Sequence, residues 1–278
     1  MRPLLPALLA AAAAFASPPA AAIAQAQAEL LNLRFTLVDL DPGDGIAPSF
    51  EFVADPEAPN RQRTELTVDV LNSGLGTADN AIQADFSFIA ALTLTRAVAG
   101  NTALSESGPD RLNVEVTSTA RGRASGFASA ESNVFFSGDF GLRLSPHTAI
   151  TISADANLSA SDAGAPGALD HAFEFAQAEA FLRVRAADPG DGSGPQEDLA
   201  LLNVATVDDA NADSDLLPGQ TLSVSFQNLS AGDLYGYLSA RATATAWGAS
   251  PIPEPATLGL AAAGLAVVAA LARRRRSR

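Results

Sequence analysis

Side chains that could bind a cation are concentrated in one acidic stretch, from Asp208 to Asp215, which reads DDANADSD. Oxygen donors occupy every second position, at Asp209, Asn211, Asp213 and Asp215. Calcium is bound by oxygen ligands at such a spacing, so the stretch is a candidate for a weak calcium site. It departs from an EF-hand because Ser214 stands at the turn glycine, Gln220 at the bidentate glutamate, and strands are expected on both sides. The alternative, which we favour, is a solvated acidic loop.

Three aromatic side chains could form a surface for sugar rings. Tyr235, Tyr237 and Trp247 are the only tyrosines and tryptophan of the chain, and all three fall in its last expected strand or at its end. Such rings stack on saccharides, but they also complete half-buried strands. We favour the second interpretation and keep a carbohydrate-binding face as the alternative.

Residues for catalysis are scarce. The chain has no cysteine and two histidines, His147 and His171, both in expected loops, where we expect them to be exposed. It contains no G-x-S-x-G, no H-E-x-x-H and no phosphate-binding glycine loop. Facing carboxylates for glycoside hydrolysis are a three-dimensional arrangement that the sequence does not specify. We therefore predict that the protein is not an enzyme.

The elements that position these residues are expected to be strands, because apolar residues alternate with polar ones between turn sequences. About ten to twelve strands with regular turns predict an all-β, β-sandwich-like fold, as one large domain or two small ones. The expected strands are Leu33–Leu40, Ser49–Val53, Glu65–Leu71, Ile82–Leu94, Leu112–Thr117, Val134–Leu144, Ile150–Leu158, Phe173–Val184, Leu199–Val207, Leu222–Leu229 and Leu234–Ala246.

One turn sequence occurs twice. Asp41-Pro42-Gly43-Asp44-Gly45 returns letter for letter as Asp188-Pro189-Gly190-Asp191-Gly192, each time after an alternating run. Proline and glycine at the central positions suit a tight turn. The repeat indicates either a duplication or two hairpins that use the same turn, and its acids could add to weak calcium binding.

The composition is that of an acidic protein without cysteine. The region between the two termini has a net charge near −19, which argues against binding to nucleic acid or to anionic lipid. Without cysteine, its stability has to come from its core, with or without help from ions. All 17 basic residues are arginine and alanine is abundant, which we attribute to codon usage.

The N-terminus has the pattern of a secretory signal peptide. Arg2 precedes an apolar run from Leu4 to Phe15, and Ala22-Ile23-Ala24 is a small-x-small site. We expect cleavage after Ala24, with Ala26 as the second choice, so that residues 1–24 are removed. The exported region is then 25–249.

The C-terminus has three consecutive parts. A linker over 250–255 ends in Pro253-Glu254-Pro255, residues 256–272 are an uncharged apolar stretch, and 273–278 contain five arginines. The stretch is just long enough for a transmembrane helix, and the arginines would stay on the cytoplasmic side. A soluble buried helix is the less favoured alternative.

Taken together, the tripeptide, span and arginine cluster resemble the PEP-CTERM sorting signal, and the resemblance is confined to this tail. It implies that Pro253, Glu254 and Pro255 are recognised by a membrane-embedded, exosortase-type transpeptidase, after export through the secretion translocon and cleavage by signal peptidase. A plain tail anchor is the alternative. We expect an inner-membrane-tethered precursor that becomes a non-enzymatic protein of the cell surface or of an extracellular, exopolysaccharide-containing matrix or biofilm. The alternative is a polysaccharide-active enzyme or a carbohydrate-binding module.

Overall fold

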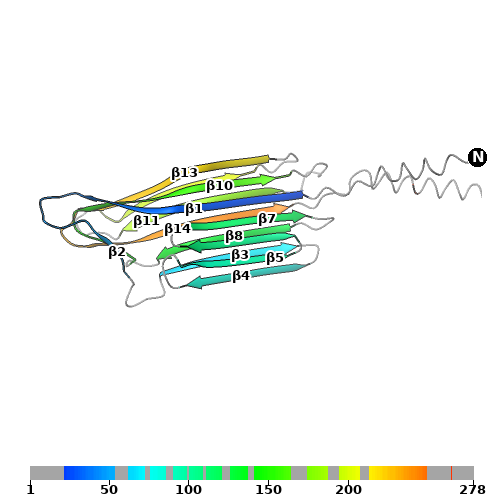
Figure 1. Ribbon diagram of the computed structural model, residues 1–278, viewed down its shortest axis with the longest axis horizontal. Helices are drawn as coiled ribbons and strands as arrows, with labels where there is room; N and C mark the ends of the chain where they lie inside the picture. The colour runs from blue at the N-terminus through cyan, green and yellow to red at the C-terminus, as the bar shows by residue number, and fades with distance from the viewer. Residues whose placement is uncertain are drawn as a thin grey trace, which may run out of the picture.

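The described part of the chain consists of β-strands (Figure 1). The computed structural model describes residues 22–53, 62–72, 76–85, 90–98, 100–108, 111–120, 126–136, 141–163, 174–186, 194–206, 213–248 and 264. The expectation of an all-β protein is confirmed. The strands are β1 (Ala22–Asp39), β2 (Phe50–Phe52), β3 (Gln62–Asn72), β4 (Thr77–Asp85), β5 (Leu92–Val98), β6 (Asn101–Gly108), β7 (Arg111–Ala120), β8 (Gly126–Phe136), β9 (Leu142–Leu144), β10 (Thr148–Asp162), β11 (Phe175–Ala186), β12 (Gln196–Ala205), β13 (Asp213–Asn228) and β14 (Leu234–Gly248).

These strands form two antiparallel sheets that pack on each other. The first has the order β13-β10-β1-β7-β6-β5 and the second the order β12-β11-β14-β8-β3-β4, with the short β2 and β9 paired beside β14. The first and last strands occupy central places, because β1 lies in the first sheet and packs against β14 in the second. Strands β3 to β8 lie on one side of β1 and β14, and strands β10 to β13 lie on the other side. Strands β1 and β14 therefore join the two halves of the sandwich.

The two ends of this structure differ, and we name them by what lies there. At the terminal end β1 begins and β14 ends, and the Gly248 N–H donates a hydrogen bond of 3.0 Å to Ser118 Oγ, next to Ala24 in the ladder. At the loop end β1 finishes at Asp39, which pairs with Thr148 of β10 and through it with Asn228 of β13.

Alternate residues of every long strand point between the sheets and form one core. Toward the terminal end the buried residues are mostly alanines, such as Ala24, Ala26 and Ala28 of β1 and Ala242, Ala244 and Ala246 of β14. Toward the loop end they are larger, among them Ile150, Ile152, Leu182, Leu238 and Phe226. Because interiors are close-packed, the alanine end requires the sheets to approach each other more closely than the loop end does.

Several expected strand boundaries were wrong. The run Ile82–Leu94 is divided, since β4 ends at Asp85 in one sheet and β5 begins at Leu92 in the other, so the chain changes sheets there. The run Val134–Leu144 likewise belongs to two strands, β8 and β9. Strand β6 was not expected at all, because Asn101, Ser105 and Ser107 point inward and remove the apolar alternation.

Candidate functional site

The group of three potential metal ligands that lie close together among the described residues is at the loop end, where the turn Asp41–Gly45 follows β1. The turn is closed by a hydrogen bond of 3.1 Å from the Asp44 N–H to the Asp41 carbonyl. Side-chain oxygens accept further backbone hydrogen bonds: Asp41 Oδ1 from Gly43 at 3.2 Å and Asp44 Oδ1 from Ile46 at 2.7 Å. Proline and two aspartates thus make the chain fold back as the sequence predicted.

A second turn, Ser145 to Thr148, holds His147 against the first. The Leu40 N–H donates to the His147 carbonyl at 2.7 Å, and the Ser49 N–H donates to Ser145 Oγ at 2.8 Å. Pro146 followed by His147 at φ 48° is the arrangement of a type II turn, whose third position favours glycine or asparagine. His147 therefore occupies a backbone conformation that is uncommon outside glycine, although histidine adopts it more often than most residues do.

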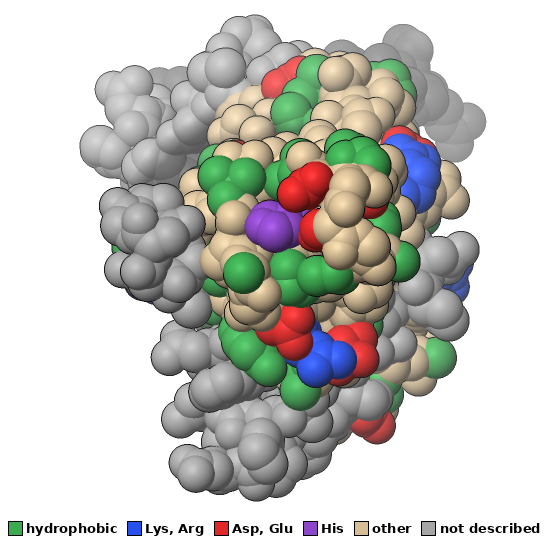
Figure 2. Space-filling view, turned by 90° about the vertical axis from the view of Figure 1, so that its left-hand side faces the viewer, with side chains coloured by type: hydrophobic (Ala, Val, Ile, Leu, Met, Phe, Trp, Pro, Cys, Tyr) green, Lys and Arg blue, Asp and Glu red, His purple; other side chains and the backbone are tan. Residues whose placement is uncertain are grey.

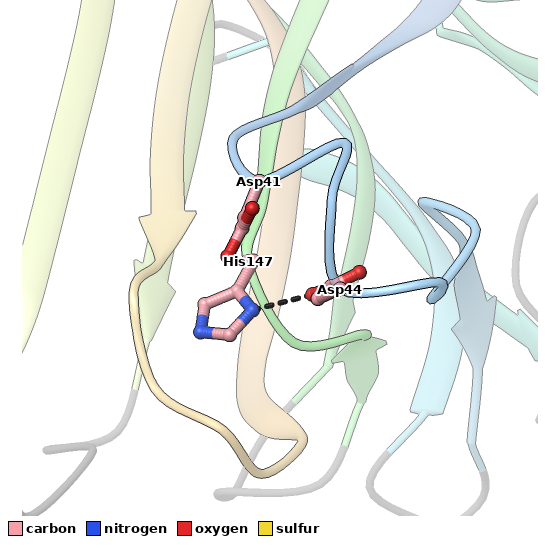
Figure 3. Close-up of side chains that lie close together, drawn as sticks. All are labelled: Asp41, Asp44 and His147. Atoms are coloured by element: carbon pink, nitrogen blue, oxygen red, sulfur yellow. Dashed lines mark hydrogen bonds and ion pairs between the residues drawn. The ribbon is translucent and has the colours of Figure 1, made fainter.

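In this arrangement the side chains of Asp41, Asp44 and His147 converge (Figure 3). One ligand atom of each lies within 4.8 Å of the other two, and His147 Nδ1 is 2.5 Å from Asp44 Oδ2. The hydrogen bond with His147 is the main cause that lowers the pKa of Asp44, and the bond from the Ile46 N–H adds to it. Viewed from the loop end, a histidine lies on the surface with acidic side chains beside it (Figure 2).

The chemistry of this cluster is that of a hydrogen-bonded turn with one free imidazole nitrogen. Nδ1 of His147 is engaged by Asp44, so Nε2 is the nitrogen that remains available to a metal. His147 was expected to be exposed, but the two turns leave its side chain only 28% exposed. The repeated pentapeptide predicted the turn at Asp41–Gly45. Nothing in the sequence indicated that His147 would lie beside this turn.

The two predicted calcium ligands that the structure describes, Asp213 and Asp215, lie at the opposite end. Asp209 and Asn211 fall outside the described residues. Asp213 and Asp215, expected in a loop, belong instead to β13, in register with Asp162 and Ala160 of β10 at the terminal end. Asp215 is exposed. The acids of the first turn pentapeptide and those of β13 are therefore separated by the length of β10 and cannot share one ion. The second pentapeptide, residues 188–192, lies outside the described part of the chain.

The three predicted saccharide-contacting residues share one face of β14 without forming one platform. Tyr235 and Tyr237 lie near the loop end, and the Tyr237 ring is 5.7 Å from the guanidinium carbon of Arg183. Trp247 lies at the terminal end, paired in register with Phe175, and its ring is 5.7 Å from that of Phe127. Ten residues of extended strand, at about 3.4 Å each, separate Tyr237 from Trp247.

The predicted sorting elements lie almost wholly outside the described residues. Pro253, Glu254 and Pro255 and residues 1–21 are not among the described residues. The second histidine, His171, is not among them either. One residue of the expected span, Gly264, is described and is helical. No helix within the described part of the chain has the length and apolar character needed to cross a membrane.

Comparison with known proteins identifies the tail. Residues 251–276 match the family model for the PEP-CTERM protein-sorting motif, which confirms the resemblance predicted from the tripeptide, span and arginines. No curated protein and no solved structure matches the chain. The motif implies export, a membrane-anchored precursor and processing by an exosortase.

Proposed function

We propose that this protein is a non-enzymatic component of the cell surface or extracellular matrix, delivered there as an exported β-sandwich and released from its membrane tail by an exosortase-type transpeptidase. The observation that carries the proposal is the PEP-CTERM motif at 251–276. An N-terminal signal peptide over residues 1–24 and a transmembrane helix over 256–272 complete the sorting pathway that we propose.

The placement of the chain ends supports this orientation. Strand β1 begins and β14 ends at the terminal end, so the sequences before and after the sandwich leave it from the same side. A tail held in the membrane then leaves the loop end, with Asp41, Asp44 and His147, as the part farthest from the attachment point. The loop end is therefore the surface that we expect to meet the environment.

The distribution of side chains supports a structural rather than a catalytic role. Tyr235 and Tyr237 are separated from Trp247 by most of β14, so they do not form a continuous sugar platform. The space between the sheets is filled mainly by alternating alanine, valine, leucine and isoleucine. A polysaccharide-active enzyme would instead need facing carboxylates beside aromatic rings in a cleft.

Fractionation of the native host tests the proposal. Changing Pro253, Glu254 and Pro255 to alanine should leave a longer form in the membrane fraction, whereas the wild type accumulates at the surface. Pro195→Ala, at an exposed proline before β12, is the control and should behave like the wild type. If the triple variant reaches the surface at the same size as the wild type, the tripeptide is not the processing signal. Cleavage of a polysaccharide by the purified protein would favour the enzymatic alternative.

A further inference from the structure

Glu174 is a buried acid whose charge is uncompensated. It directly precedes β11 at the terminal end and has no exposed surface. Neither of its carboxylate oxygens has a hydrogen-bond partner among the described residues. Burial of a charged group is costly unless hydrogen bonds or an opposite charge compensate it. A buried, ionised Glu174 therefore needs a cation or a hydrogen-bond donor beside its carboxylate.

A second acid lies beside it. Asp162, the last residue of β10, is 7% exposed and acts electrostatically on Glu174. Burial first, and the charge of Asp162 second, raise the pKa of Glu174 to about 7. Asp162 is also the register partner of Asp213, so a third acidic residue is placed at this edge of the sheet.

No arginine is among the causes that shift the pKa of Glu174. Arg183 of β11 and Arg241 of β14 bind Glu197 and Glu179 on the outer face of their sheet. Glu174 and Asp162 instead lie on the inner side, with β10 in one sheet and β11 in the other. A partner that compensates Glu174 therefore has to enter between the sheets.

Backbone oxygen atoms are also fixed near this point. The Thr206 N–H donates to the Ala176 carbonyl at 2.9 Å, and the Ala176 N–H donates to Thr206 Oγ1 at 2.9 Å. The end of β12 is thereby held beside the start of β11, two residues from Glu174. Calcium binds several oxygens at once, from carboxylates and carbonyl groups, and so suits a place where strand ends meet.

We propose that Glu174 and Asp162 are ligands of a divalent cation of the calcium class, bound between the two sheets at the terminal end. The cation neutralises both carboxylates and links β10 of one sheet to β11 of the other. The link lies where the core is made of alanines, next to the points at which the chain leaves toward its termini. Calcium outside the cell would thus stabilise the tethered end of the protein.

Thermal unfolding of the full-length chain, with calcium removed by a chelator and then added to about 1 mM at about pH 8, tests the site. The wild type should gain about 3 to 6 °C in Tm. Glu174→Gln and Asp162→Asn should lose this gain, while Glu115→Gln, at an exposed acid of β7, should keep it. Because the amide removes a buried charge, Glu174→Gln should be at least as stable as the chelated wild type, which also shows that it folds.

Two outcomes would overturn the proposal. If Glu174→Gln keeps the calcium response, the ligands lie elsewhere, for example among the acids from Asp208 to Asp215. If the wild type shows no response and simply becomes more stable as the pH falls below about 7, Glu174 takes up a proton and the site binds no cation. A smaller calcium gain at about pH 6 than at about pH 8 is expected, because the cation competes with a proton.

Discussion

Asp155 fixes the one irregularity in β1. The register between β1 and β10 shifts between Leu31 and Arg34, and Asn32 there has a φ of 56°. Asp155 of β10 accepts two hydrogen bonds from Arg34, at 2.8 and 2.6 Å, and one from Asn32 at 3.0 Å. The hydrogen bonds from Arg34, followed by the one from Asn32, hold the pKa of Asp155 well below its usual range.

This shift predicts a pH-dependent contribution to stability. A carboxyl whose pKa is depressed by folding stabilises the protein above its unfolded pKa and loses that contribution as the pH falls toward the folded pKa. Asp155→Asn should therefore lower the Tm at neutral pH, and its difference from the wild type should shrink below about pH 3.8. Calorimetry over a pH series measures this. Glu115→Gln, at an exposed acid of β7, is the control. A difference that is independent of pH would contradict the assignment.

The positive φ of His147 predicts how substitutions at this position affect stability. Asparagine tolerates a positive φ and valine does not, so His147→Val should destabilise the protein by about 1 to 2 kcal/mol more than His147→Asn does. Denaturant unfolding of both variants gives the comparison. Equal stabilities would mean that the turn relaxes to another conformation, and that the place of His147 beside Asp44 is not fixed by the backbone.

Single residues could be predicted only where local chemistry decided their conformation. The turn at Asp41–Gly45 followed from its proline and glycines, and it is found. The meeting of Asp44 with His147 and the burial of Glu174 depend on strand pairings between residues far apart in the sequence. Nothing in the neighbourhood of Glu174 distinguishes it from the exposed acids of the chain.

At the scale of the elements, β12 and β13, which are edge strands of different sheets, form hydrogen bonds with each other through their side chains. Gln196 of β12 donates from Nε2 to the Gln227 carbonyl at 2.7 Å and accepts from the Gln227 N–H at 3.1 Å, as a neighbouring strand would. Asp198 accepts a hydrogen bond from the Ser225 N–H at 2.8 Å. Side chains of β12 thus form hydrogen bonds with backbone N–H and C=O groups at the edge of β13. These groups are then less available for pairing with a strand of another chain.

Strand β14 requires a glycine where it meets the end of β11. A Cβ on Gly236 would lie 2.5 Å from the Arg185 carbonyl oxygen and 3.1 Å from the Ala186 Cα. Because those atoms belong to the backbone, Gly236→Ala should destabilise the protein by about 1 to 3 kcal/mol. Gly232→Ala, where nothing lies within 4 Å of the added carbon, should change the stability by less than about 0.5 kcal/mol. Equal effects in denaturant unfolding would contradict this account of the β11–β14 pair.

The sequence predicted the class of fold correctly but not the lengths of the strands. The alanine content of the strands explains this difference. The alternating alanines of β1 and β14 are buried, yet alanine has a low β propensity and carries little signal in an apolar pattern. We therefore expected β1 to begin at Leu33, whereas it begins at Ala22. The alanines that we attributed to codon usage are the core of the terminal end.

At the scale of the whole molecule, the same residues belong to two patterns. Ala22-Ile23-Ala24 has the spacing of a signal peptidase site and is also the start of β1, where Ala24 is fully buried. Cleavage after Ala24 leaves Ala26 and the rest of the strand in place, whereas cleavage after Ala26 removes a second buried alanine. The fold therefore favours Gln25 over Gln27 as the first residue of the exported protein.

The central claim is that the PEP-CTERM tail is removed while the sandwich stays intact at the surface. The motif match covers 251–276, and the sandwich ends at Gly248, so a cut near Pro253-Glu254-Pro255 spares every described strand. From the sequence, we expect the prolines before the proposed span to deny this segment a regular helix or a central strand, so that the proposed protease would meet an extended peptide there.

The most direct test is intact-mass measurement of the protein collected from the surface of its native host. The account predicts a chain that begins at Gln25 and lacks residues 256–278. A surface protein whose mass includes the tail, with peptides ending at Arg278, would show that the C-terminus is an ordinary anchor and that the sorting assignment is wrong.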